Sequence, residues 1–229
     1  IPHGAELQRI IVFSDASLDV VAFAVYLDIR NADHSSSCTF LFANAYSRHA
    51  SIPSLEMLSF VIALNELHAL ILRHSDSLLP NSAVRIEFKL DSVCTLHSLN
   101  VNKLSKSILT KNAKDKMVCH LAQLSKGFNL LIYIGFTPTH TQAADLATKY
   151  YEGLVSTVNS NSWRHGSADQ TIPLLDGETT YLFTNQGTVT WAGIEPKCTM
   201  INCQEYDTDF CECRLCDTAF WSPYKALFI

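Results

Sequence analysis

The sequence predicts an α/β domain built on a mixed five-stranded sheet with helices on both faces. Three apolar segments near the N-terminus, each rich in β-branched or aromatic residues, are joined by short polar links that favour antiparallel hairpins. A long apolar helix follows, and then two further strands that each lead into helical sequence. Because strand–helix–strand crossovers produce parallel strands, we expect three antiparallel strands followed by two parallel ones.

Local patterns place each element in turn. Pro53 suits the first turn of the long helix, which Ser51 or Ser54 could cap. Apolar residues lie nearly all round this helix, so we expect it to be largely buried. The expected strands are residues 9–13, 20–29, 39–46, 84–90 and 130–136, and the expected helices are residues 51–74, 94–99 and 142–151, with a helix-prone basic stretch at 102–126.

The chain divides into three parts by composition. After about Tyr151 the pattern changes to stretches rich in Ser, Asn, Thr and Gly, with short strands at best. We therefore expect a sheet-based domain over residues 1–151, a connecting segment over 152–197, and a small Cys-rich tail over 198–229.

Composition limits the class of protein. The hydrophobic content of 48% and charged content of 17% predict a sizeable core and exclude wholesale disorder. The net charge of −5 means that nucleic-acid binding would need a local basic patch or bound cations. Apolar runs are interrupted by polar residues, so no membrane-spanning helix is expected. The scattered cysteines favour a reducing, intracellular compartment, and Ile1 in place of an initiator Met suggests a piece of a longer product.

Four acidic residues fall at matched places in the predicted fold. Asp15 ends the first strand, Glu56 is expected in the first turn of the long helix, Asp91 ends the fourth strand, and Asp145 begins the last helix. Functional groups of open sheets gather at strand ends and adjacent helix starts. Carboxylates that meet raise one another's pKa, and a hard divalent cation removes that penalty. Taken singly, each acid is more often a turn former or helix-start residue, so the case rests on all four together.

The chemistry that such a cluster supports is phosphoryl hydrolysis. Four carboxylates can hold two Mg²⁺ or Mn²⁺ ions about 3.5–4 Å apart, and such a pair activates water and clamps a phosphate. A stretch rich in lysine between the fourth and fifth strands could contact a nucleic-acid backbone, although a solvated helix face is an equally good interpretation. Its candidate residues are Lys103, Lys106, Lys111, Lys114 and Lys116.

The tail carries a second possible metal site. Cys198 and Cys203 form one pair and Cys213 and Cys216 another, with Cys211 spare. Two such pairs are typical of tetrahedral structural Zn²⁺. Structural zinc, free thiols and disulfides remain open here, because the fifth cysteine blurs the choice of ligands.

Four segments, in order, resemble the ribonuclease H domain of BEL/Pao-type LTR retrotransposon polyproteins, and a fifth resembles the Trp–Gly stretch that follows that domain. The resemblance covers roughly residues 7–166, with Gln142-Ala143 in place of that family's Asn-Pro and Lys89-Leu90 in place of its aromatic-Thr. The segments are FSDAS at 13–17, SIPSLEM at 51–57, LDS at 90–92, AADLAT at 143–148 and WRHG at 163–166.

The resemblance implies a ribonuclease H fold and cleavage of the RNA strand of an RNA–DNA hybrid. It implies that Asp15, Glu56, Asp91 and Asp145 are metal ligands, and that a reverse transcriptase adjoins the domain in a polyprotein. In many ribonucleases H a His before the last Asp assists product release or proton transfer; His140 is placed for that role, or is a solvated loop residue.

Three other functions compete with the nuclease. An aspartic peptidase is disfavoured, because residues 15–17 lack the Gly that its Asp-Thr-Gly or Asp-Ser-Gly loop needs. A ribonuclease H-like module that binds nucleic acid or protein without cutting would keep the same acids. So would an inert polyprotein spacer that folds, and only an activity measurement separates these readings.

Overall fold

A computed structural model describes the sheet, its main helices and parts of the segments that follow. The described residues are 4–78, 84–92, 94–96, 120–121, 124, 128, 130–154, 172, 181–183 and 189–190. The strands are β1 (Glu6–Ala16), β2 (Val20–Arg30), β3 (Ser36–Ser47), β4 (Val84–Leu90), β5 (Leu130–Phe136), β6 (Tyr181–Phe183) and β7 (Val189–Thr190). The helices are α1 (Ile52–Leu78), the short 3₁₀ helix η1 (Thr139–Thr141) and α4 (Asp145–Tyr151).

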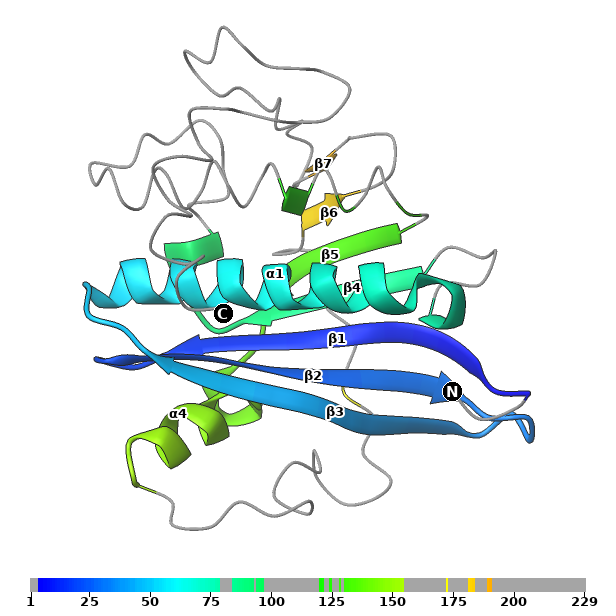
Figure 1. The fold of residues 1–229 in the computed structure, drawn as a ribbon, viewed down its shortest axis with the longest axis horizontal. Helices are drawn as coiled ribbons and strands as arrows, with labels where there is room; N and C mark the ends of the chain where they lie inside the picture. Colours follow the sequence, from blue (N-terminus) through cyan, green and yellow to red (C-terminus); the bar gives the residue numbers. More distant parts are fainter. Residues whose placement is uncertain are drawn as a thin grey trace, which may run out of the picture.

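One mixed sheet organises the molecule, with strand order β3-β2-β1-β4-β5-β6-β7 (Figure 1). β1, β2 and β3 are antiparallel neighbours, while β4 lies parallel to β1 and β5 parallel to β4. The predicted α/β fold class and its five-strand arrangement are confirmed. The sheet has two more strands than predicted. β6, of three residues, pairs antiparallel with β5, and β7, of two residues, pairs antiparallel with β6. Strands that short carry too few residues for an alternating pattern to show in the sequence.

The two faces of the sheet bury separate cores. Alternation along β1 places Ile10 and Val12 in one cluster and Ile11 and Phe13 in the other. The first face is covered by α1, whose Phe60 packs edge-on against Phe88 of β4 with ring centroids 5.0 Å apart. Figure 1 shows α1 on one side of the sheet and α4 on the other, as predicted.

Several boundaries differ from the expected ones for local reasons. β3 begins at Ser36 rather than residue 39, because residues 36–38 pair with the end of β2 despite their polar side chains. α1 continues to Leu78 past a kink at His74, where φ is −127° and ψ is 21°. α4 begins at Asp145 rather than residue 142, because Gln142 is extended, with φ −77° and ψ 101°.

The long helix also bears on the expectation that no segment could cross a membrane. By length and composition alone, Ile52–His74 is apolar enough to span a bilayer, which is weak evidence for a membrane segment and does not overturn that expectation. The apolar character has another cause here, because 56% of its most apolar window is buried inside the protein. Leu55, Phe60 and Leu67 on this helix are fully buried core residues. A core helix packed on a sheet passes the same test.

Candidate metal centre

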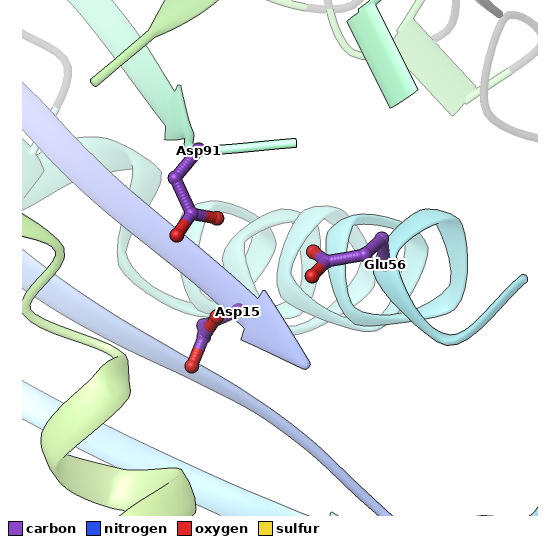
Figure 2. Close-up of side chains that lie close together, drawn as sticks. All are labelled: Asp15, Glu56 and Asp91. Atoms are coloured by element: carbon purple, nitrogen blue, oxygen red, sulfur yellow. The ribbon is translucent and has the colours of Figure 1, made fainter. Parts of the chain in front are cut away.

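Three acidic side chains meet where β1 and β4 end. The last register pair of these parallel strands is Ser14 with Leu90. Asp15 and Asp91 are the next residues of these two neighbouring strands, so they lie at the same edge of the sheet. Glu56 reaches the same point from α1, as Figure 2 shows. One carboxylate oxygen from each of the three residues lies within 4.8 Å of the others. Glu56 belongs to the second turn of α1 rather than the first, because the helix begins at Ile52 and its first turn holds no acid.

Asp15 is the most enclosed member of the cluster. Burial raises the pKa of its carboxyl to about 7, and repulsion by Asp91 adds to the rise. The hydroxyl of Thr148 on α4 donates a hydrogen bond of 3.0 Å to Asp15 Oδ2, which opposes that rise in pKa. Because Thr148 is itself buried, this bond from α4 fixes the position of Asp15 Oδ2.

The pKa values of Glu56 and Asp91 are raised as well. Burial, followed by repulsion from Asp15 and Asp91, raises the pKa of Glu56 to about 8. Burial also raises the pKa of Asp91, against hydrogen bonds from the side chains of Thr139 and Gln142. Asp91 Oδ1 is buried without a hydrogen-bond partner among the described residues. Three converging carboxylates, one with an orphaned oxygen, are a donor set that suits a hard divalent cation such as Mg²⁺ or Mn²⁺.

Asp145 stands beside this cluster rather than in it. Its charge raises the pKa of Asp15 and of Asp91, which places it close to both. Its Oδ2 is paired with Lys149 Nζ at 2.5 Å, one turn further along α4. Of the four acids predicted to meet, three therefore share one point and the fourth is engaged by a neighbouring lysine.

The remaining predicted residues are partly beyond what the structure describes. His140 lies in η1 and is exposed, in the loop that leads to Asp145. The lysines between residues 103 and 116 and the cysteines between residues 198 and 216 lie outside the described residues. The nucleic-acid patch and the zinc site stay predictions.

Sequence reasoning missed the polar residues that hold the acids in place. Thr148, Thr139 and Gln142 all reach the clustered carboxylates from the segment between β5 and the end of α4. A single Thr or Gln in a loop or a helix gives no signal by itself. The departure from the family pattern at Gln142 was the one visible sign that this position differs.

The antiparallel trio of strands with two parallel strands beside β1 has the topology of a ribonuclease H-like fold, and three acids meet at its shared strand ends. Residues 3–80 match the model of the family described as Pao retrotransposon-like RNaseH-like domain, which confirms the predicted resemblance. The matched segment contains Asp15 and Glu56, whereas Asp91 and Asp145 lie beyond it. No curated protein matches the chain.

Solved ribonuclease H structures are among those similar to this chain. The N-terminal RNase H domain of rv2228c from Mycobacterium tuberculosis has 13% identity and a TM-score of 0.42, with 66% of this chain and 100% of that chain covered. RNase H1 from the archaeon Halobacterium salinarum has 14% identity and a TM-score of 0.40, with 63% and 97% covered. LC11-RNase H1 from compost, solved with an RNA/DNA hybrid, has 14% identity and a TM-score of 0.37, with 64% and 98% covered.

Proposed function

We propose that this domain is a metal-dependent endonuclease that cleaves the RNA strand of RNA–DNA hybrids as part of a retrotransposon polyprotein. The observation that carries the proposal is the meeting of Asp15, Glu56 and Asp91 oxygens within 4.8 Å of one another. A buried group of three acids is costly unless cations neutralise it, so the arrangement favours a metal-binding role over a structural one. The match of residues 3–80 to the Pao retrotransposon-like family supports the choice of nucleic acid.

The residues have distinct parts in this proposal. Asp15, Glu56 and Asp91 would hold the ions, and Asp145 would join them when its carboxylate leaves Lys149. Bound Mg²⁺ or Mn²⁺ would supply an activated water and stabilise the charge that develops on the phosphate. Thr148 fixes the rotamer of Asp15 through its hydrogen bond. His140, exposed in the loop beside α4, is proposed to assist product release or proton transfer.

Cleavage of a labelled RNA–DNA hybrid tests the proposal. We expect cutting that requires Mg²⁺ or Mn²⁺ and falls by at least about 100-fold in Asp91→Asn, which removes the charge of a ligand while keeping its shape. Asp33→Asn, an exposed acid in the β2–β3 turn, is the matched control and should cut like the native chain. Cutting that survives Asp91→Asn would refute the assignment of this site.

A binding module without nuclease activity is the second candidate. The observation in its favour is the ion pair between Asp145 and Lys149, which occupies the fourth carboxylate. In the cleavage assay this candidate predicts hybrid binding in the native chain with no cutting at any Mg²⁺ or Mn²⁺ concentration.

The rest of the proposal follows the family resemblance. A reverse transcriptase is proposed to adjoin the domain in an intracellular polyprotein, and the lysines between residues 103 and 116 are proposed to grip the hybrid. Replacing Lys111, Lys114 and Lys116 together should weaken hybrid binding and reduce its salt dependence. For the tail, metal analysis with and without Cys213→Ser would distinguish a zinc site from free thiols or disulfides.

A further inference from the structure

A buried glutamine bridges the two strand ends that carry the clustered aspartates. Gln142 Nε2 donates a hydrogen bond of 2.9 Å to the carbonyl oxygen of Ser14 in β1 and one of 3.4 Å to that of Lys89 in β4. Its Oε1 accepts from the backbone N–H of Ala144 at 3.4 Å. With 5% of its surface exposed, this side chain has little freedom to adopt another arrangement.

The backbone around the glutamine fixes where its side chain begins. Gln142 follows η1 in an extended conformation, and its own N–H donates to the carbonyl of Thr139. The next turn starts at once, since the N–H of Asp145 donates to the Gln142 carbonyl. The segment between β5 and α4 is thereby anchored on both sides of this one residue.

The two carbonyls that Gln142 bridges lie next to the clustered aspartates in the chain. Ser14 directly precedes Asp15, and Lys89 lies two residues before Asp91. The β1–β4 ladder ends with the pair Ser14 and Leu90, so beyond it no strand pairing holds Asp15 and Asp91 together. Their charges repel each other, which favours separation of the strand ends.

An amide is well suited to this position. It carries two N–H donors on one nitrogen, and both can be directed at carbonyl oxygens on neighbouring strands. The same amide lies close enough to Asp91 to lower the pKa of that carboxyl. A buried hydrocarbon here would leave two carbonyls and one aspartate without this donor.

We propose that Gln142 is a positioning residue that ties the end of β1 to the end of β4 and so sets the separation of the Asp15 and Asp91 carboxylates. Its link to metal affinity rests on the proposed function, whereas its tie between the strands does not. Residues that orient metal ligands through hydrogen bonds typically change metal affinity by about 10- to 100-fold when replaced.

Two variants of the full chain test the proposal. Gln142→Met keeps the length of the side chain and removes its donors and acceptor. Gln142→Asn keeps an amide but is one methylene shorter, so it reaches at most one of the two carbonyls. It tests the proposal in place of the Met variant if that variant folds poorly. Thr141→Val is the matched control, because it removes a hydroxyl from the same loop that bonds Thr137 and the Pro138 carbonyl.

Two measurements separate a positioning role from general destabilisation. In metal-free protein, hydrogen exchange should quicken at the amides of residues 14–16 and 90–92 in Gln142→Met and remain unchanged in the middle of β1 and β2. Calorimetric titration with Mn²⁺ alone should show affinity lower by about 10- to 100-fold in Gln142→Met, by less in Gln142→Asn, and within about twofold of native in Thr141→Val.

The outcomes distinguish this inference from the proposed function. A native chain that binds no Mn²⁺ contradicts the proposed function, while the exchange experiment still decides whether Gln142 ties the strands. A native chain that binds Mn²⁺ together with a Gln142→Met variant that binds it equally well overturns the positioning role. Exchange that quickens evenly through the whole sheet also overturns it, because the glutamine would then be an ordinary core residue.

Discussion

Two carboxyls of the cluster titrate near neutral pH, and this makes the metal-free domain sensitive to pH. The pKa of Asp15 is raised to about 7 and that of Glu56 to about 8, in both cases chiefly by burial. A carboxyl whose pKa is higher in the folded than in the unfolded state stabilises the folded protein when it is protonated. This contribution is fully present at pH values below the unfolded-state pKa. That contribution is lost as the pH rises through the folded pKa. The window of lost stability therefore runs from about pH 4 to about pH 8.

Melting temperatures measured across this window check the titration of Asp15. In EDTA the native chain should become less stable between pH 5 and pH 8, and Asp15→Asn should be more stable than native at pH 8 by about 2–4 kcal/mol, because it removes a buried charge. Adding Mn²⁺ should reverse the trend for the native chain, since the ion binds the ionised carboxylates. A native melting temperature that is flat in EDTA across this range would show that these carboxyls are not strained.

Under the proposed function, Lys149 would compete with a cation for the Asp145 carboxylate. Its ammonium is 2.5 Å from Asp145 Oδ2, and about half of its side chain is exposed, so the pair is weak and can exchange. Lys149→Met should free Asp145 and tighten Mn²⁺ binding by roughly two- to fivefold. This change in affinity corresponds to the free energy of an exposed ion pair. Lys149→Arg should bind as the native chain does. Weaker binding by Lys149→Met in calorimetry would mean that the lysine supports the site.

How far the site could be predicted differs from residue to residue. Asp15 and Asp91 were predictable because the carboxyl ends of parallel neighbouring strands coincide. Glu56 was assigned to the first turn of the long helix, whereas α1 begins at Ile52 and its first turn holds no acid. The engagement of Asp145 by Lys149 was not predictable, because an acid and a lysine four residues apart are common on any helix.

At the scale of elements, β4 carries a row of charged residues. Its sequence predicts the strand but not the burial of these charges. Arg85, Glu87 and Lys89 alternate with apolar residues, which is typical of a strand with one face in water. Glu87 and Lys89 are instead buried, on the face opposite α1. Arg9 Nη1 donates to Glu87 Oε2 at 2.9 Å, and Arg85 Nε donates to Oε1 at 2.5 Å. Arg9 reaches Glu87 from the neighbouring strand β1, which local sequence cannot show, and together with Arg85 it makes this burial possible.

Glu87 is the anion on which this row depends. Glu87→Gln keeps the shape of the side chain but leaves the Arg9, Arg85 and Lys89 cations without their shared counter-charge, although Asp28 still pairs with Arg9. We expect it to lower the free energy of unfolding by about 3–5 kcal/mol in urea denaturation. Glu152→Gln, an exposed acid just after α4, should change it by less than about 0.5 kcal/mol. Equal stabilities for the two variants would show that the row is held by packing alone.

At the scale of the whole molecule, residues after α4 contribute to the same sheet. Ile172 is buried against the face that holds Ile11 and Phe13, and its carbonyl accepts a hydrogen bond from Arg9 Nη2. β6 pairs with β5 and so covers an edge that would otherwise be open. The domain boundary predicted at Tyr151 stays a prediction. The change in composition there marks the end of the long helices and strands, but it does not indicate which later residues pack against the sheet.

A chain ending at Leu154 would lose three contributions at once, and its stability tests how far the domain extends. It lacks the buried Ile172 side chain, a partner for the Arg9 guanidinium, and the strand that pairs with β5. Burying an Ile side chain is worth about 1.5–3 kcal/mol and a hydrogen bond to a charged group about 1.5–3 kcal/mol, so the shortened chain should be less stable by at least about 3 kcal/mol. A chain ending at Thr190 keeps all three and should unfold within about 1 kcal/mol of the full chain. If both shortened chains unfold alike in urea, the segments after α4 only rest on the sheet, and the domain is complete at α4.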